Sequence, residues 1–242
     1  MKNRILGFIM GMLMISGTAL ASDVYITQSG EDFTANINQD GQTNRYGQSG
    51  TVATHTGDDQ TLDIDQIGNT NTITATVVGA TQTLTLRQAG NSNTSTVSVG
   101  ANSASADNSI IQTLTGNSNT TTVNVAATAA GDDADIDLVL TGDSNTVTIH
   151  ENSTATMIGD DKKITNITAI GGSNTITATH SGAADQDTTI HHTGSDSTFS
   201  ITQDGAHDGT VSITTVGSDH NVTGTMDDEV YIVCYTSLCG YR

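Results

Sequence analysis

Apolar and polar residues alternate with a period of two along most of the chain. Between residues 60 and 66, Gln60, Leu62, Ile64 and Gln66 share one parity, and threonine or aspartate fills the other. After a short break the alternation resumes with Asn71, Ile73, Ala75 and Val77. Alternation of this kind predicts strands with one buried and one exposed face.

The breaks between alternating segments share a glycine three residues ahead of an asparagine. The six copies are Gly41 to Asn44, Gly68 to Asn71, Gly90 to Asn93, Gly116 to Asn119, Gly142 to Asn145 and Gly171 to Asn174. Gly194 to Ser197 and Gly217 to Asn221 are degenerate copies. From Gly68 onward the glycines are 22 to 29 residues apart, so the turn is kept while the repeat length drifts. We expect glycine to supply the positive φ of a tight corner.

These units predict an all-β fold, a β-solenoid of stacked strand-turn-strand repeats over residues 22–225. One arch cannot bury its apolar face alone, but arches stacked in register bury it between two sheets. Adjacent copies would lie about 4.8 Å apart, with Gln above Gln and Asn above Asn, an arrangement compatible with cross-β assembly.

Composition agrees with this fold and argues against an enzyme. The chain has 25 glycines, no proline, no tryptophan and only 34% hydrophobic residues, too few for a conventional core of large side chains. His191 and His192 are the most suggestive pair for chemistry, but neighbours on a strand point to opposite faces. We therefore expect a protein that is not an enzyme, with no catalytic residues, no metal site and no cofactor.

Residues 1–21 have the pattern of a secretory signal peptide. Lys2 and Arg4 precede a short apolar run, and Ala19-Leu20-Ala21 supplies a small-x-small cleavage site. Its removal leaves no transmembrane segment and predicts a secreted protein. The chain without residues 1–21 has five basic and 26 acidic residues. This balance excludes nucleic acid as a partner, because binding to phosphates requires basic patches.

The last segment, residues 226–242, changes character and is predicted to be a C-terminal cap or anchor. Val230 to Val233 is an apolar β-run with tyrosines beside it, preceded by acidic residues. Cys234 and Cys239 lie outside the cytoplasm once the signal is cut, so a local disulfide is permitted. Two free thiols are the alternative.

The repeat resembles that of curlins, the subunits of bacterial curli fibres, whose pattern is Ser-x5-Gln-x-Gly-x2-Asn-x-Ala-x3-Gln. Ser22, Gln28, Gly30, Ala35 and Gln39 stand at curlin positions in the first copy, with Phe33 in place of asparagine. The motif residues that carry the resemblance or the stacking are Ser22, Gln28, Gly30, Gln39, Gly41, Asn44, Gln48, Gly50, Gln66, Gly68, Asn71, Gln88, Gly90, Asn93, Gly116, Asn119, Gly142, Asn145, Gly171 and Asn174. Later units replace the glutamine with Leu114, Leu140, Ala169 and His192, so the chain looks like a divergent member.

The resemblance implies a secreted subunit that assembles with itself into an extracellular amyloid fibre at the cell surface. It further implies a structural role in biofilm matrix and surface adhesion, a nucleator subunit as a partner, and export through an outer-membrane channel. Unpaired strand edges at the two ends of a solenoid are an independent physical reason to expect self-assembly.

Two other functions fit the same pattern. Thr-x-Thr repeats on the second strand of each unit, such as Thr72, Thr74 and Thr76, look like the flat face of some ice-binding solenoids. Aspartates gather in loops such as Gly57-Asp58-Asp59, Gly131-Asp132-Asp133 and Gly159-Asp160-Asp161, which would suit a calcium-binding β-roll adhesin module. The glycine-rich nonapeptide of such rolls is missing from the sequence.

Overall fold

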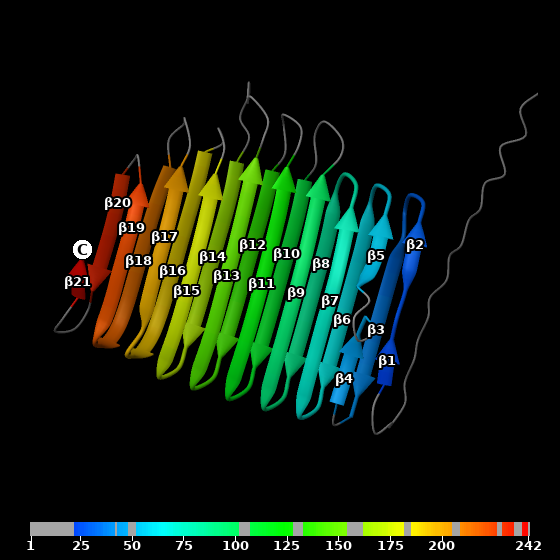
Figure 1. Ribbon diagram of the computed structural model, residues 1–242, viewed down its shortest axis with the longest axis horizontal. Coiled ribbons are helices and arrows are strands. Elements are labelled where there is room, and N and C mark those ends of the chain that lie inside the picture. The colour runs from blue at the N-terminus through cyan, green and yellow to red at the C-terminus, as the bar shows by residue number, and fades with distance from the viewer. Residues whose placement is uncertain are drawn as a thin grey trace, which may run out of the picture.

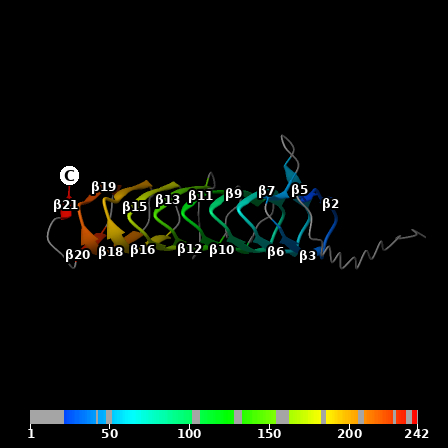
Figure 2. The same ribbon diagram turned by 90° about the horizontal axis from the view of Figure 1, so that it is seen from below.

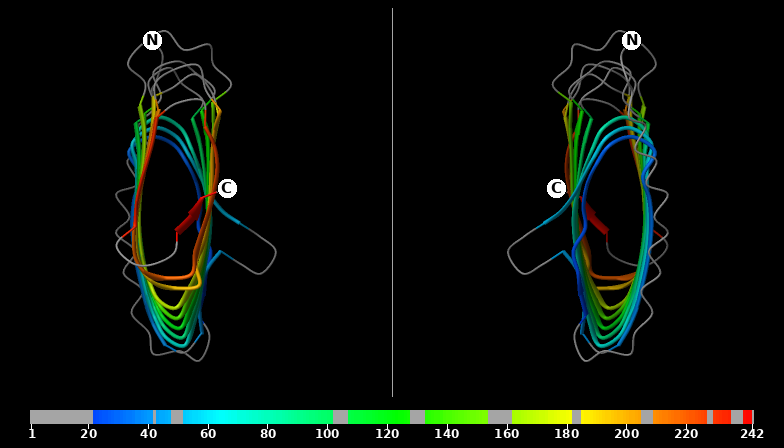
Figure 3. Two further views of the ribbon diagram at one scale, coloured as in Figure 1. Left: turned by 90° about the vertical axis from the view of Figure 1, so that its left-hand side faces the viewer. Right: turned by 90° about the vertical axis from the view of Figure 1, so that its right-hand side faces the viewer.

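The computed structural model is an all-β solenoid of parallel stacked strands, which confirms the predicted fold class (Figure 1). It describes residues 22–41, 43–47, 52–101, 107–127, 133–153, 162–181, 185–204, 209–226, 229–234 and 239–241. Within these ranges the chain forms two parallel sheets that face one another, and Figure 3 shows them end-on as two walls.

One sheet has twelve strands and the other has nine. The twelve-stranded sheet contains β1 (Ser22–Val24), β2 (Thr27–Ser29), β4 (Thr43–Tyr46), β5 (Ala53–Thr56), β7 (Thr70–Val78), β9 (Ser92–Ala101), β11 (Ser118–Ala127), β13 (Ser144–Ser153), β15 (Ser173–Ser181), β17 (Thr198–Asp204), β19 (His220–Met226) and β21 (Cys239–Tyr241). The nine-stranded sheet contains β3 (Thr34–Asp40), β6 (Gln60–Ile67), β8 (Gln82–Ala89), β10 (Asp107–Thr115), β12 (Asp133–Thr141), β14 (Lys162–Ile170), β16 (Asp185–Ser195), β18 (Gly209–Ser218) and β20 (Glu229–Cys234).

The chain alternates between the sheets, so each coil contributes one strand or split strand to each (Figure 2). A short turn that begins at a repeat glycine leads from the nine-stranded to the twelve-stranded sheet, for example from β6 through Gly68 to β7. We call this side of the slab the tight edge; it is the lower edge in Figure 1. The opposite side, where the chain returns to the nine-stranded sheet, is the arch edge.

The period-two pattern explains why the strands bury one face each. In β6, residues Gln60, Leu62, Ile64 and Gln66 are buried, as the alternation predicted. Stacking in register turns each buried position into a column, such as Ile37, Ile64, Leu86, Gln112, Leu138, Ile167, Ile190 and Ile213. Aliphatic side chains from the two walls therefore form one continuous core along the slab.

The first two coils are less regular than the rest. β4 and β5 together pair with β7, but six residues separate Tyr46 from Ala53 where β7 has only Thr74. The twelve-stranded sheet is therefore interrupted at its N-terminal end, which the alternation pattern did not indicate.

The two ends of the sequence fall partly outside the described residues. The predicted signal peptide, residues 1–21, lies outside them entirely. In the C-terminal segment β20 pairs with β18 and β21 pairs with β19, both in parallel, so the tail adds strands to the stack. Its role as a cap or anchor stays a prediction.

Candidate functional site: the stacked edges and the threonine face

Two inward residues five positions apart form each corner of the tight edge. The pairs are Gln39 and Asn44, Gln66 and Asn71, Gln88 and Asn93, Leu114 and Asn119, Leu140 and Asn145, Ala169 and Asn174, His192 and Ser197, and Thr215 and His220. All of these side chains are buried. The turn is the same length in every coil, so the corners stack directly upon one another.

The asparagines of the tight edge form a hydrogen-bonded ladder from coil to coil. The Nδ2 of Asn71 donates to the Oδ1 of Asn93 at 2.9 Å, and Asn93 donates to Asn119 at 2.8 Å. Asn119 donates to Asn145 at 2.8 Å and Asn145 to Asn174 at 2.7 Å. Each amide also reaches a backbone carbonyl of the next coil, as Asn93 does with Thr115 at 2.9 Å. The ladder thereby pairs the buried Nδ2 groups from Asn71 to Asn145 and the Oδ1 groups from Asn93 to Asn174 along the axis of the slab.

A shorter glutamine ladder stands beside it in the first coils. The Nε2 of Gln66 donates to the Oε1 of Gln39 at 2.6 Å, and Gln88 donates to Gln66 at 3.0 Å. The column continues through Leu114, Leu140, Ala169, His192 and Thr215. Amide stacking at this position is therefore confined to the N-terminal third of the solenoid.

Glycine is required at the tight edge by close stacking. A Cβ added to Gly116 would lie 1.9 Å from the carbonyl oxygen of Gly90, and one on Gly142 would lie 1.8 Å from that of Gly116. The φ angles of Gly68, Gly90, Gly116 and Gly142 are outside the left-handed region, so the expected positive φ is wrong there. Gly171 has a φ of 153° and combines both requirements.

The first copy of the repeat is shifted by half a coil from the position that the curlin pattern suggested. Gln28 pairs with His55 in the twelve-stranded sheet, and Gly30 stacks on Gly57 at the arch edge. Ser22 instead pairs with Asn44, at a tight-edge corner. The pattern was misleading because a glutamine two residues before a glycine precedes the bend at both edges. Gln48 and Gly50 lie outside the described residues.

The last two corners replace the amides with histidine and hydroxyl groups. His192 Nε2 lies 2.7 Å from Asn174 Nδ2 and 2.9 Å from Ser197 Oγ, and its ring centroid is 5.0 Å from that of His220. Burial first, and then the neighbouring His220, lower the pKa of His192 to about 4. His220 occupies the corner position that we assigned to Asn221, which is exposed. Spacing decides the corner here, because His220 lies three residues after Gly217.

The arch edge is compact in the first coils. Gly30, Gly57 and Gly79 stack there, each with positive φ, and Asp32 and Asp59 adopt φ values of 57° and 55°. Gln60 and Gln82 are not among the predicted motif residues, yet both donate to arch carbonyls; Gln60 reaches Gly30 O at 2.9 Å and Gln82 reaches Ala80 O at 2.8 Å. The acidic loop at 57–59 lies in this compact part. Residues 131, 132 and 159–161 lie outside the described ranges.

Threonines cover the outer face of the twelve-stranded sheet in registered columns. One column joins Thr72, Thr94, Thr120, Thr146, Thr175 and Thr198, and a second joins Thr74, Thr96, Thr122, Thr148 and Thr177. The outer face of the nine-stranded sheet is mixed instead. There Arg87 bridges Asp63 at 3.0 Å and Asp65 at 2.9 Å, beside exposed Ile111 and Val139.

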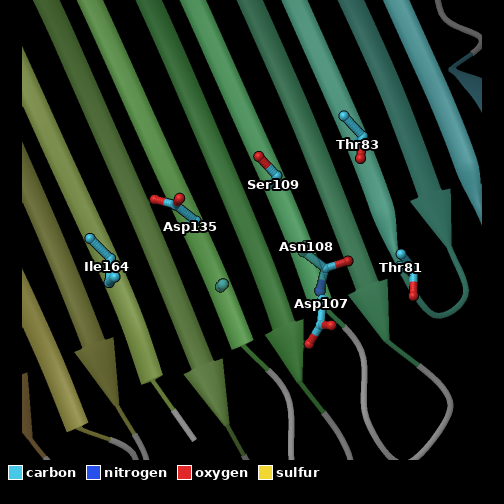
Figure 4. Close-up of a pocket in the computed structure, with 8 residues that line it drawn as sticks. Thr81, Thr83, Asp107, Asn108, Ser109, Asp135 and Ile164 are labelled. Carbon is cyan, nitrogen blue, oxygen red and sulfur yellow. The ribbon is translucent and has the colours of Figure 1, made fainter.

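A shallow hollow of about 370 Å³ lies on the nine-stranded sheet near the arch edge (Figure 4). Asp107, Ser109 and Asp135 contribute polar groups, and Thr83 and Ile164 flank them. Among the described residues, no group of three or more His, Cys, Asp or Glu side chains could hold a metal ion. The hollow therefore adds no ligand set to the calcium hypothesis.

The remaining predicted site residues are placed as follows. His191 is exposed and His192 is buried, so the two point to opposite faces as expected. Cys234 ends β20 and Cys239 begins β21, where they pair with Thr215 and His220 respectively. The two cysteines thus follow the last described corner pair in register. Their side chains lie outside the described part, and the disulfide stays a prediction.

Comparison with protein-family models, curated proteins and solved structures gives no match. Within the described ranges, no helix has the length and apolar character needed to span a bilayer.

Proposed function

We propose that this protein is a secreted subunit that assembles with copies of itself into a curli-like extracellular fibre, with a structural role in biofilm matrix and adhesion. The observation that carries the proposal is the parallel register of both sheets, which is continuous from β6 and β7 to the last described strands. From there each strand presents to the next a parallel backbone edge in the same register, although the residues of the corner column change along the stack. A second copy can continue that arrangement without a change of geometry.

The ends of the stack support this proposal. β3 is the last strand of the nine-stranded sheet on one side and β20 is the last on the other, so each has one strand neighbour within the described chain. The sequence contains no proline to block pairing at either edge. Within the chain, the corner ladder supplies an additional reason for regular stacking, because each asparagine from Asn71 to Asn145 donates to the asparagine of the next coil.

Acidic arches oppose association and give it a pH dependence. Asp32 stacks near Asp59 and Glu31 near Asp58, in a chain whose formal net charge is −19. Like charges at neighbouring positions destabilise pairing and are screened by salt. We expect fibre growth to accelerate as pH falls toward about 4, where aspartate begins to protonate.

The deciding experiment incubates the purified mature chain, residues 22–242, and follows thioflavin T fluorescence, electron microscopy and fibre diffraction. Fibres with reflections near 4.8 Å and 10 Å are the expected result. Growth should depend on both pH and salt. A chain that is folded by circular dichroism yet stays monomeric at high concentration under all these conditions would show that the proposal is wrong.

The resemblance to curlins also carries the proposed partners and location. A nucleator subunit and an outer-membrane channel are the partners implied by that family, and the fibre would stand at the cell surface. A non-enzymatic role fits the interior of the described coils, which is filled by stacked side chains.

The threonine face favours ice binding as a second candidate function. Two threonine columns run in register over at least five coils of a sheet, which gives a repeating array of methyl and hydroxyl groups. The test measures thermal hysteresis and ice recrystallisation with monomer. Thr122→Lys should abolish any activity, whereas Thr113→Lys on the other sheet should leave it intact. Wild-type monomer without activity would exclude this candidate.

A further inference from the structure

The short strand β21 occupies a special position at the C-terminal end of the stack. It pairs with the first three residues of β19, with Cys239 opposite His220 and Tyr241 opposite Val222. The rest of β19, from Thr223 to Met226, pairs only with β17 among the described strands. β21 is thus a partial tenth layer on an otherwise open edge.

The first strand of the chain belongs to the same two columns. Ser22 pairs with Asn44, which begins the asparagine column that leads through Ser197 and His220 to Cys239. Val24 pairs with Tyr46, in the column that includes Phe199 and Val222 and ends at Tyr241. β1 and β21 therefore hold equivalent register positions at opposite ends of one molecule.

We propose that β21 occupies the place that β1 of a second copy takes at a fibre junction, so that the tail must leave β19 before the copies join. The inference rests on the proposed function, since it describes how the same self-assembly is delayed. Continuing the columns past β20 and β19 would place β3 on β20 and β1 on β19, at the position of β21. Every junction contains one C-terminal end, so the requirement holds whichever end of the fibre grows.

The extent of pairing favours the second copy over the tail. β21 pairs with three residues of β19. In continued register, β1 would pair with those same three residues of β19. β2 would pair with the end of β19, because Gln28 of β2 belongs to the same column as Met226. β3 would pair with all of β20. The tail therefore slows the addition of a copy without preventing it. A net cost on the order of one backbone hydrogen bond, about 0.7 to 1.4 kcal/mol, corresponds to a threefold to tenfold change in rate.

The test compares elongation from preformed full-length seeds by three mature chains: residues 22–242, residues 22–238 without β21, and residues 22–241 without Arg242 as the matched control. The chain that ends at 238 should elongate about threefold to tenfold faster, and the control should match the full-length chain. Gly240→Pro provides a full-length variant with a weakened β21, because proline has no backbone N–H to donate, and it should also accelerate growth.

A second readout follows the tail itself. Carboxypeptidase should remove the terminal residues faster from fibres than from monomer, because the junction displaces β21. Equal or slower elongation without β21, or equal digestion of fibre and monomer, would overturn the inference while leaving fibre formation standing. If full-length seeds never form, the proposed function and this inference both fall.

Discussion

The two long edges of the slab both connect one sheet to the other, but they do so in different ways. At the tight edge the turn has one length, and glycine and asparagine columns stack from coil to coil. At the arch edge an equally compact turn occurs at Gly30, Gly57 and Gly79, where the strand glutamines Gln60 and Gln82 satisfy the arch carbonyls. The later connections there vary in length from coil to coil: eight residues separate β13 from β14, whereas three separate β15 from β16.

The difference shows that one stacked edge is enough to hold the register. Repeat spacing drifts between 22 and 29 residues because the arch edge absorbs the extra residues. The tight edge cannot accommodate extra residues or a side chain at its glycines, because the backbone of each turn lies against the next. Four predictions follow from this contrast between a rigid and a tolerant edge.

Substitution of the tight-edge glycine should have the largest effect. Gly116→Ala would place a Cβ 1.9 Å from Gly90 O, so a turn must shift, and we expect a loss of at least about 3 kcal/mol in the free energy of unfolding. Gly100→Ala, near the arch edge, is the matched control, because its Cβ would meet nothing closer than Val78 Cγ2 at 4.0 Å. Chemical denaturation of both variants measures the difference. Equal losses would mean that close stacking on the preceding turn is not what requires glycine at position 116.

Loss of an amide should also cost more at the tight edge. Asn119→Ala leaves the buried Oδ1 of Asn145 without its donor and removes one of the two donors to the carbonyl of Thr141, at an expected cost of about 2 to 4 kcal/mol. Gln82→Ala removes a donor from two arch carbonyls but leaves no buried side-chain acceptor behind, since the carbonyl of Ala80 keeps the N–H of Asp59, and about 1 to 2 kcal/mol is expected. Urea unfolding at pH 7 measures both. The reverse order would mean that the arch, and not the corner ladder, holds the coils together.

The histidine corner should make stability depend on pH. Burial lowers the pKa of His192 in the folded state to about 4, so the unfolded chain binds a proton at higher pH than the folded one. Stability is therefore complete above about pH 6.5 and falls as pH decreases toward 4, by up to about 3 kcal/mol for this residue. His192→Gln, which restores the amide found at Gln88, should reduce the slope, and the exposed His191→Gln should not. Unfolding curves between pH 4 and 7 measure how the free energy of unfolding changes with pH. The same pH dependence in wild type and His192→Gln would show that His192 is not its source.

Charge at the arches should have the smallest effect. Asp59 stacks near Asp32 of the preceding coil, so Asp59→Asn relieves a like-charge contact. The substitution should raise the free energy of unfolding by about a few tenths of a kcal/mol, as expected for a pair of surface charges. Asparagine also tolerates the φ of 55° at this position. Asp143→Asn at the tight edge is the control, because its neighbours in the stack are Asn117 and Gly172. The gain should shrink in high salt; a gain that is independent of salt would have another origin.

Much of this architecture follows from the sequence because strand alternation and turn spacing are local signals. Leu62 and Ile64 predict the buried face of β6, and the regularly spaced glycines predict the tight edge. The sequence does not predict at which edge the first coil places its motif. Gln28 and Gly30 have the same spacing as Gln66 and Gly68, although the first pair lies at the arch edge and the second at the tight edge. Likewise His220, rather than Asn221, enters the corner, since distance from Gly217 outweighs residue type. The interruption between Tyr46 and Ala53 has no signal in the alternation at all.

The separation of successive coils along the chain also bears on how the molecule reaches its native state. No described strand pairs with its immediate successor, so a first contact between coils must bring together residues 19 to 29 positions apart before any pairing offsets the lost entropy. Once two coils have met, each later coil lands on an edge that already exists. In the proposed fibre, folding of one chain and elongation would then be the same elementary event, and they would differ only in whether a peptide bond joins the arriving segment to the template.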